Sequence, residues 1–301
     1  MRNLRDLNEL DRIAIIGVGL LGGSIGLALR AAGFVGRRIG IGRRVTSLEK
    51  ALAFDAVDEV TCDVAAGVTK ADLVILGTPI GMFEPLLRQM APALSPGTLV
   101  TDVASTKMEV VRLTSKLLPR SVYFVGSHPM AGSEKTGVEY ARADLFEDAL
   151  CLITPTRNTP PNTVQPFEWF WRRLGGRTIT LSPQKHDRLL ARISHLPHAV
   201  AAALIQVARS QRAIELAGPG FGDSTRIASG DPAMWTDILR TNAKSMIESI
   251  DMLIAELQQL RGRLAQDDAR AIEKWLASSK TTRDEWVALR YEQSHKRGHS
   301  T

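Results

Sequence analysis

Short apolar runs alternate with helix-like segments over about the first 180 residues of the chain. Val, Ile and Leu dominate most of these runs, which read IAIIGV, RIGIG, DLVILGT, LVTDV, VYFVGS, LCLITPT and TITL. Continuous apolar strands separated by helices are typical of a parallel sheet that is covered on both faces, which predicts an α/β fold. The stretch TRNTPPNTVQP is interpreted as a loop that precedes a helix, FEWFWRRL.

The pattern changes to almost pure helix from Ser182 onwards. Ser182 and Pro183 form a favourable helix start, because serine caps the first turn and proline fits within it. Apolar residues then recur at helical spacing, as Leu189, Leu190, Ile193, Leu196, Val200, Leu204 and Val207. We place a boundary here and predict two domains, residues 1–182 and residues 183–301.

A second helix start, Asp231-Pro232, opens a long segment with apolar residues from Ile238 to Leu260. That apolar stripe is too broad for a helix alone in water, so we expect it to pack on other helices, including those of a second subunit.

The composition is that of an ordinary soluble protein, with 44% hydrophobic and 23% charged residues among 301. No apolar run is long enough to cross a membrane, and the N-terminus lacks a signal-peptide core. The net charge of +6 is spread along the chain and is interpreted as a mildly basic solvated surface rather than a nucleic-acid footprint. An anionic small substrate or cofactor fits this charge equally well. Cys62 and Cys151 show no metal-ligand spacing, so we expect no metal, a reducing compartment and, by default, the cytoplasm.

A glycine-rich turn, Gly17-Val18-Gly19-Leu20-Leu21-Gly22, joins the run IAII to the helical pattern SIGLALRAAG. Strand, turn and helix in this order form a dinucleotide-binding fingerprint of the Rossmann type. The first glycine permits the tight turn, the second lets the backbone approach a pyrophosphate, and the third allows close helix packing. A glycine-rich turn without a ligand is the alternative. The cofactor contacts that we predict are Gly17, Gly19, Leu20, Leu21 and Gly22.

The residues after RIGIG bear on the choice of cofactor. NAD is usually held by an acidic residue at this point, whereas Arg43 and Arg44 stand here and no acid occurs between Arg30 and Glu49. Two guanidinium groups suit the 2′-phosphate of NADP, so the sequence favours NADP over NAD. The alternative is a solvated pair of arginines at a strand end.

Three strand ends carry small or polar residues at the edge of the sheet where ligands of such folds bind. Thr78 and Pro79 are assigned to the cofactor site, with a plain loop as the alternative. Ser105 either lies in the site or caps the helix that follows it. His128 belongs to GSHPMAGSEKTG, a segment poor as helix or strand, and is either part of a surface turn or a general base beside the nicotinamide.

In the helical part, the motif SHLPH places His195 and His198 three residues apart on one helix face, and Pro197 interrupts the helical hydrogen bonds. A kinked apolar helix is typical of a ligand pocket, while two core or surface histidines are the alternative. A metal site would need a third ligand nearby.

The glycine-rich turn GPGFGDSTRIASGDPAMW carries Asp223, Arg226 and Trp235. Such a loop between helices presents side chains to a cleft, where Arg226 can grip a carboxylate in bidentate fashion. An internal salt bridge from Arg226 to Asp223 or Glu215 is the alternative.

Six segments follow one another over about residues 12–260: GVGLLGGSIGLAL, TDVASTK, GSHPMAGSEKTGVEYARADLF, ITPT, ISHLPHAVAAAL and GFGDSTRIASGDPAMW. Together they resemble the prephenate/arogenate dehydrogenase family of tyrosine biosynthesis. The resemblance implies an α/β, Rossmann-type nucleotide-binding domain followed by an all-α dimerisation domain, and hence a homodimer. It also implies NAD(P)-dependent oxidative decarboxylation of prephenate to 4-hydroxyphenylpyruvate, of arogenate to tyrosine, or of both.

The resemblance further implies roles for individual residues. His128 would take the proton from the ring 4-hydroxyl as hydride departs, and Ser105 would orient that hydroxyl near the nicotinamide. Arg226 would hold the ring carboxylate. The other residues implied at the substrate are His198 towards the side chain, Glu134 at the pocket rim and Trp235 in support of the pocket or the dimer.

Two positions depart from the family pattern: Arg43 stands where many members carry an acid, and Gly222 where some carry a lysine. The choice between prephenate and arogenate therefore stays open. Another NADP-linked dehydrogenase, of the β-hydroxyacid dehydrogenase or imine reductase type, is the alternative enzyme, and a non-catalytic nicotinamide sensor is the alternative class. About forty residues follow Leu260, so we expect no separate regulatory domain.

Overall fold

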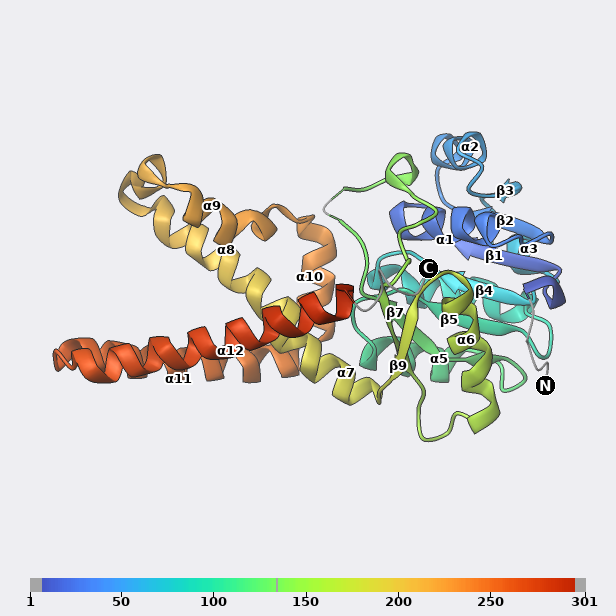
Figure 1. Ribbon diagram of the computed structural model, residues 1–301. Coiled ribbons are helices and arrows are strands. Elements are labelled where there is room, and N and C mark those ends of the chain that lie inside the picture. The colour runs from blue at the N-terminus through green and yellow to red at the C-terminus, as the bar shows by residue number, and fades with distance from the viewer. Residues whose placement is uncertain (1–6, 134, 296–301) are drawn as a thin grey trace. The chain divides into compact units, whose positions relative to one another are not determined.

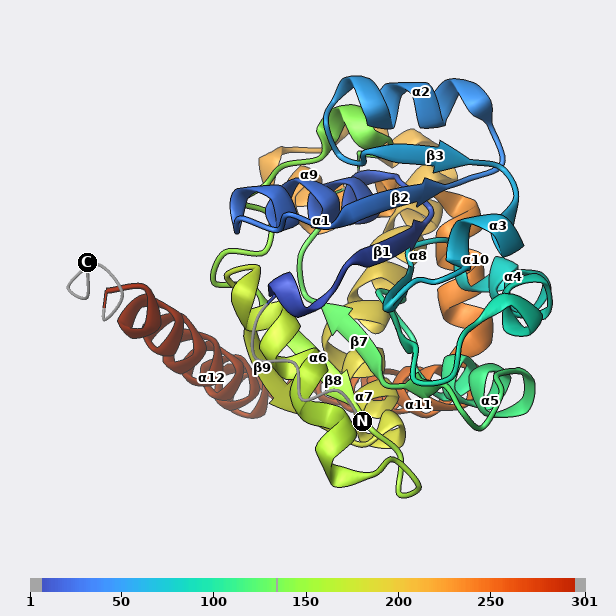
Figure 2. The same ribbon diagram turned by 90° about the vertical axis from the view of Figure 1, so that its right-hand side faces the viewer.

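A six-stranded parallel sheet organises the N-terminal part of the computed structural model, which describes residues 7–133 and 135–295 (Figures 1 and 2). The strands lie in the order β3-β2-β1-β4-β5-β6. The chain runs outward from β1 and returns beside it to β4, so the strand order reverses between these two strands. The bounds are β1 Arg12–Ile16, β2 Arg37–Ile41, β3 Glu59–Thr61, β4 Leu73–Leu76, β5 Leu99–Asp102 and β6 Tyr123–Phe124.

Each face of this sheet has its own hydrophobic core. Ile13 and Ile15 of β1 pack with residues of α1 and α6, whereas Ala14 and Ile16 pack with residues of α3, α4 and α5. The predicted sheet with helices on both faces is confirmed. Successive side chains of a strand point to opposite faces, so a sheet covered on both faces needs apolar residues at consecutive positions, as in Ile13–Ile16. The helices are α1 Leu20–Ala31, α2 Val45–Ala53, α3 Val64–Val68, α4 Phe83–Met90, α5 Met108–Leu117 and α6 Pro161–Arg173, with short turns η1 Leu7–Glu9, η2 Ile80–Met82, η3 Ala91–Ala93 and η4 Val138–Tyr140.

A second sheet, of three strands, carries the histidine of GSHPMAG. Strand β7 (Gly126–Pro129) pairs antiparallel with β8 (Leu150–Thr154), which pairs parallel with β9 (Arg177–Thr180). The run VYFVGS is therefore split between the two sheets. The segment GSHPMAGSEKTG was predicted to be poor as helix or strand, and this was wrong for its first four residues, because pairing with β8 and the burial of all four stabilise them as a strand.

Two further details differ from the prediction. Strand β3 escapes the sequence pattern because it has only three residues and begins with the exposed Glu59. Helix α6 begins at Pro161, inside the stretch interpreted as a loop, because proline is well accommodated in the first turn of a helix.

Helices make up the rest of the chain up to α10. Helix α7 (Pro183–Leu190) begins as predicted, with Ser182 Oγ accepting a hydrogen bond from Lys185 N at 3.2 Å. Helix α10 (Pro232–Thr241) begins in the same way, with Asp231 Oδ1 accepting from Met234 N at 2.7 Å. Between them lie a π-helical turn η5 Ala191–His195, α8 Leu196–Arg209, η6 Ser210–Leu216, α9 Pro219–Thr225 and η7 Arg226–Ser229.

The chain divides into two compact units, residues 1–246 and 247–301. The second holds most of α11 (Ala243–Ala265) and all of α12 (Ala269–His295) up to the end of the described residues. These helices lie side by side, and Trp275 Nε1 donates a hydrogen bond to Glu256 Oε2 at 3.2 Å (Figure 1). Among the described residues, no helix combines the length and the apolar character that crossing a membrane requires. The division between these two compact units falls after Met246, so the domain boundary at residue 182 stays a prediction.

Candidate active site

The turn between β1 and α1 lies where the strand order of the main sheet reverses. Gly17 has a φ of +95°, a left-handed conformation that favours glycine, and a Cβ there would lie 2.8 Å from Cγ2 of Thr78. A Cβ on Gly22 would lie 2.1 Å from the carbonyl oxygen of Gly17. A Cβ on Gly19, in contrast, would meet no heavy atom within 4 Å. The turn is packed at its first and third glycines and open at the second, as a cradle for a pyrophosphate requires.

The surroundings of this turn fit a dinucleotide. Helix α1 has no acidic residue in its first turn and no side-chain cap at Gly19, so its N-terminus suits an anion. Thr78 Oγ1 is buried and has no hydrogen-bond partner in the structure. Arg43 and Arg44 are exposed beyond the end of β2, and neither forms an ion pair within the described residues. The remaining predicted contacts are Leu20 and Leu21, half-buried in the first turn of α1, and the exposed Pro79.

His128 is buried on β7, only 8% exposed. Its Nδ1 lies 2.9 Å from Nε2 of His186 on α7, and Nδ1 of His186 lies 2.8 Å from Oδ1 of Asp187. Burial lowers the pKa of His128 well below its ordinary value, and the charges of His186, Lys107 and His195 lower it further. The ring is therefore neutral at neutral pH and can accept a proton.

A fully buried ion pair between Lys107 and Asp102 adjoins the start of β7. Oδ1 of Asp102 accepts a hydrogen bond from Ser127 N at 3.2 Å, and Oδ2 accepts one from Ala104 N at 2.9 Å. Burial raises the pKa of Asp102, and the nearby Lys107 opposes this effect. These contacts tie the end of β5 to the backbone next to His128.

Ser105 lies half-buried in the turn between β5 and α5. The alternative that it caps the following helix is wrong. The first turn of α5 is capped instead by Asp187, whose Oδ1 and Oδ2 accept hydrogen bonds from Lys107 N at 2.8 Å and Met108 N at 2.9 Å. The Ser105 hydroxyl forms no hydrogen bond within the described part of the chain.

The two histidines of SHLPH contact the same tryptophan. The ring of His198 stacks on Trp235 with centroids 3.5 Å apart and planes inclined by 21°, while His195 meets it edge-on at 6.2 Å. Nε2 of each histidine is buried without a hydrogen-bond partner. Burial lowers the pKa of His195 to about 4 and also lowers that of His198. The two neutral rings and the indole form one cluster, and the π-helical turn that precedes Pro197 is a feature frequent at functional sites.

Arg226 is exposed at the start of η7. Within the described residues it forms no ion pair with Asp223 or Glu215, so the alternative of an internal salt bridge is wrong. Its guanidinium is available to a ligand. Glu134, predicted at the pocket rim, lies outside the described residues.

The sequence pattern missed the part of the site that α7 contributes. Pro183, His186, Asp187 and Leu190 share the buried face of this helix, so two ionisable groups stand in a stripe that is normally apolar. That stripe is the signal that could have found them. Asn242 Nδ2 donates to the backbone oxygen of Asp187 at 2.7 Å and lies 3.3 Å from Nδ1 of His195, which links the two groups of histidines. No group of three or more His, Cys, Asp or Glu side chains within residues 7–133 and 135–295 is arranged to hold a metal ion.

Two protein-family models match consecutive parts of the chain. The model described as "Prephenate dehydrogenase, nucleotide-binding domain" matches residues 25–180. The model described as "Prephenate dehydrogenase, dimerization domain" matches residues 182–278.

Curated relatives match over most of their length. The prephenate dehydrogenase of Bacillus subtilis is 36% identical over 285 residues, which cover 92% of this chain and 77% of that protein. The cyclohexadienyl dehydrogenase of Zymomonas mobilis is 34% identical over 268 residues, which cover 87% of this chain and 91% of that protein.

Solved structures show the same similarity. The prephenate dehydrogenase of Aquifex aeolicus, in complex with hydroxyphenyl propionate and NAD+, is 32% identical with a TM-score of 0.84, covering 91% of this chain and 98% of that one. The arogenate dehydrogenase of Synechocystis is 32% identical with a TM-score of 0.80, covering 91% and 99%. A 3-hydroxyisobutyrate dehydrogenase of Mycobacterium tuberculosis, at 16% identity and a TM-score of 0.51, shares the fold alone.

Proposed function

This chain belongs to the prephenate dehydrogenase family, and from that premise we propose that it oxidatively decarboxylates prephenate to 4-hydroxyphenylpyruvate, arogenate to tyrosine, or both. It is an oxidoreductase of tyrosine biosynthesis with NAD or NADP as its cofactor. The similarity to a 3-hydroxyisobutyrate dehydrogenase extends only to the fold.

The observation that supports the catalytic assignment is the neutral, buried ring of His128. In our proposal the imidazole of His128 accepts the proton of the substrate's 4-hydroxyl. At the same time, hydride leaves the substrate carbon that carries this hydroxyl. That substrate carbon becomes a carbonyl, and the substrate ring then becomes aromatic when its carboxylate leaves as CO₂. A bound nicotinamide supplies the hydride acceptor.

Two further side chains hold the substrate in this proposal. The hydroxyl of Ser105 orients the substrate's 4-hydroxyl, and the guanidinium of Arg226 binds the ring carboxylate in bidentate fashion. The stacked pair of His198 and Trp235 forms a wall beside the substrate's side chain. The role of Glu134 at the rim stays a prediction.

For the cofactor, we propose that Gly17, Gly19 and Gly22 let the backbone and the start of α1 approach the pyrophosphate. Leu20, Leu21, Thr78 and Pro79 complete these contacts. The chain after β2 carries the exposed guanidinium groups of Arg43 and Arg44 and no acidic residue before Glu49. This supports a preference for NADP.

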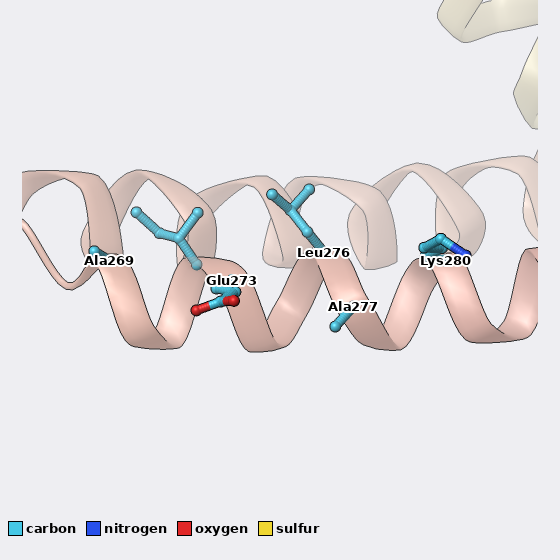
Figure 3. Close-up of a pocket in the computed structure, with 6 residues that line it drawn as sticks. Ala269, Glu273, Leu276, Ala277 and Lys280 are labelled. Atoms are coloured by element: carbon cyan, nitrogen blue, oxygen red, sulfur yellow. The ribbon is translucent and has the colours of Figure 1, made fainter.

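We also propose a homodimer formed through the helical domain, in keeping with the dimerization-domain match. A shallow groove of about 530 Å³ runs along α12 and is formed by one helix only (Figure 3). It contains none of the proposed catalytic residues, and its apolar lining suits contact with another helix. The groove is lined by Ala269, Ile272, Glu273, Leu276, Ala277 and Lys280. Exposed apolar residues elsewhere on α11 and α12 include Ile247, Met252, Ile254, Leu257, Leu264 and Leu289.

The free Cys62 and Cys151 favour a reducing compartment, so we propose the cytoplasm as the location.

A steady-state assay of prephenate and arogenate, each with NAD and with NADP, tests the function. We expect turnover with at least one of the four pairs, and the ratio of kcat/KM values measures both preferences. Absence of turnover with all four pairs would contradict the proposal.

A further inference from the structure

Three buried side chains from two elements form a continuous hydrogen-bonded chain. His128 lies on β7, and His186 and Asp187 lie on α7. The first two share a hydrogen bond of 2.9 Å between Nδ1 of His128 and Nε2 of His186, and the last two share one of 2.8 Å between Nδ1 of His186 and Oδ1 of Asp187. The exposed fractions of the three residues are at most 8%. Water therefore does not compete for these bonds.

The position of each proton in this chain follows from the carboxylate at its end. A carboxylate only accepts hydrogen bonds, so Nδ1 of His186 carries a proton. Burial lowers the pKa of His186, although its bond to Asp187 opposes this, and the ring is neutral at neutral pH with Nε2 as an acceptor. Nδ1 of His128 must then be the donor in their shared bond. The lone pair of His128 is left on Nε2.

Asp187 is held in place independently of the histidines. Its two carboxylate oxygens accept hydrogen bonds from the backbone N–H groups of Lys107 and Met108 at the start of α5. Asn242 binds its backbone oxygen at 2.7 Å. The carboxylate therefore lies at the positive end of the α5 dipole, and its two backbone hydrogen bonds hold it beside His186. Capping α5 alone would not require a histidine between Asp187 and His128.

We propose that His186 and Asp187 are positioning residues that hold the proton of His128 on Nδ1, so that Nε2 is the atom that receives the substrate's hydroxyl proton. This proposal rests on the function proposed above. In the reaction the substrate O–H bond breaks and the Nε2–H bond forms. The positive charge that His128 gains is stabilised by its bond to His186 and, through that ring, by the carboxylate of Asp187. The other charged or titratable groups that face these rings are Lys107, Asp102 and His195.

Nitrogen NMR of the full-length protein tests the proton positions directly. With selective ¹⁵N labelling of the six histidines, we expect the signals of His128 and His186 to show a proton on Nδ1 at pH 7.5. Each signal is assigned by its loss in a single His→Gln variant. A proton on Nε2 of His128 in the unmodified protein would overturn the proposal.

Two substitutions of His186 separate positioning from packing. In His186→Gln the side-chain carbonyl can still accept the Nδ1 proton of His128, whereas His186→Leu removes the acceptor and keeps an apolar side chain. We expect His186→Gln to retain kcat within about tenfold and His186→Leu to lose about 10²-fold, with cofactor affinity unchanged in both. Equal losses in the two variants, or no loss in His186→Leu, would overturn the proposal.

Asp187→Asn tests the end of the chain. The substitution removes the negative charge that fixes the proton on Nδ1 of His186, and with it the group that sets the direction of both hydrogen bonds. We expect kcat to fall by about 10²–10⁴-fold, as expected when a base holds the wrong tautomer. Asp63→Asn, which changes the exposed cap of α3, is the matched control and should keep full activity. Full activity of Asp187→Asn contradicts the positioning role. An unmodified enzyme without turnover contradicts only the proposed function, because the NMR measurement of the proton positions does not depend on turnover.

Discussion

The carbonyl oxygen of Gly17 lies only 2.1 Å from the position that a Cβ on Gly22 would take. The two glycines let α1 start directly against the turn that follows β1. This contact is between backbone atoms, which cannot move aside as a flexible side chain can.

Alanine substitutions in this turn should therefore separate folding from cofactor binding. Gly22→Ala should destabilise the protein by about 1–3 kcal/mol through overpacking. Gly19→Ala should leave the free energy of unfolding within about 0.5 kcal/mol, because its Cβ meets nothing in the protein. It should nevertheless weaken NAD(P) binding by about tenfold or more, since the methyl group takes the space of the pyrophosphate. Urea unfolding and a cofactor titration by fluorescence measure the two effects, and a Gly19→Ala protein with unchanged cofactor affinity would contradict the predicted cradle.

Arg43→Ala should weaken NADP binding by about 10–100-fold, the loss of one charge-assisted contact worth about 1.5–3 kcal/mol. NAD binding should change little, because NAD lacks the 2′-phosphate. Arg37→Ala, an exposed arginine at the other end of β2, is the matched control. Dissociation constants of both cofactors for the three proteins check the prediction, and equal affinities of the unmodified protein for NAD and NADP would contradict it.

His128→Asn should lower kcat by at least about 10²–10⁴-fold, the usual contribution of general-base catalysis. Asparagine retains an N–H close to the position of Nδ1, so the bond to His186 can persist while the basic Nε2 is lost. Cofactor affinity should stay nearly unchanged. Steady-state kinetics and a cofactor titration provide the test, in which a fast His128→Asn enzyme would refute the role of His128 as the base.

Stability should fall as the pH falls below about 6.5, because buried histidines have lowered pKa values. Burial lowers the pKa of His195 from 6.5 to about 4, so between these values the unfolded chain binds more protons than the folded one. Lowering the pH from 7 to 5 should cost about 2 kcal/mol through His195 alone. His128 and His186, whose pKa values are lowered as well, should add to that loss.

The variant His195→Asn isolates this contribution, since asparagine can still accept the hydrogen bond from Asn242 but does not titrate. Urea unfolding at pH 7 and pH 5 should show a loss of stability about 2 kcal/mol smaller than in the unmodified protein. An identical loss in both proteins would show that His195 does not titrate in this range.

The sequence alone predicted those helices and strands whose formation depends on residues close together in the chain. Apolar runs without alternation predicted the strands of the main sheet other than β3, and the pairs Ser182-Pro183 and Asp231-Pro232 predicted the starts of α7 and α10. These features depend on periodicity and capping, which act over a few residues. The order of the strands and the second sheet were not predictable in this way, because Gly126–Pro129 becomes a strand only through its pairing with β8.

For the candidate site, the residue types and spacing in the chain pointed to His128, Ser105 and Arg226, and to the glycine turn. Tertiary structure decided what surrounds them. Asp187 and Lys107 are 80 positions apart, and His186 and His128 are 58 apart, yet both pairs are joined by hydrogen bonds. The physical reason is that a buried histidine takes its tautomer and its pKa from whichever polar groups folding brings within about 3 Å, and no local pattern records those contacts.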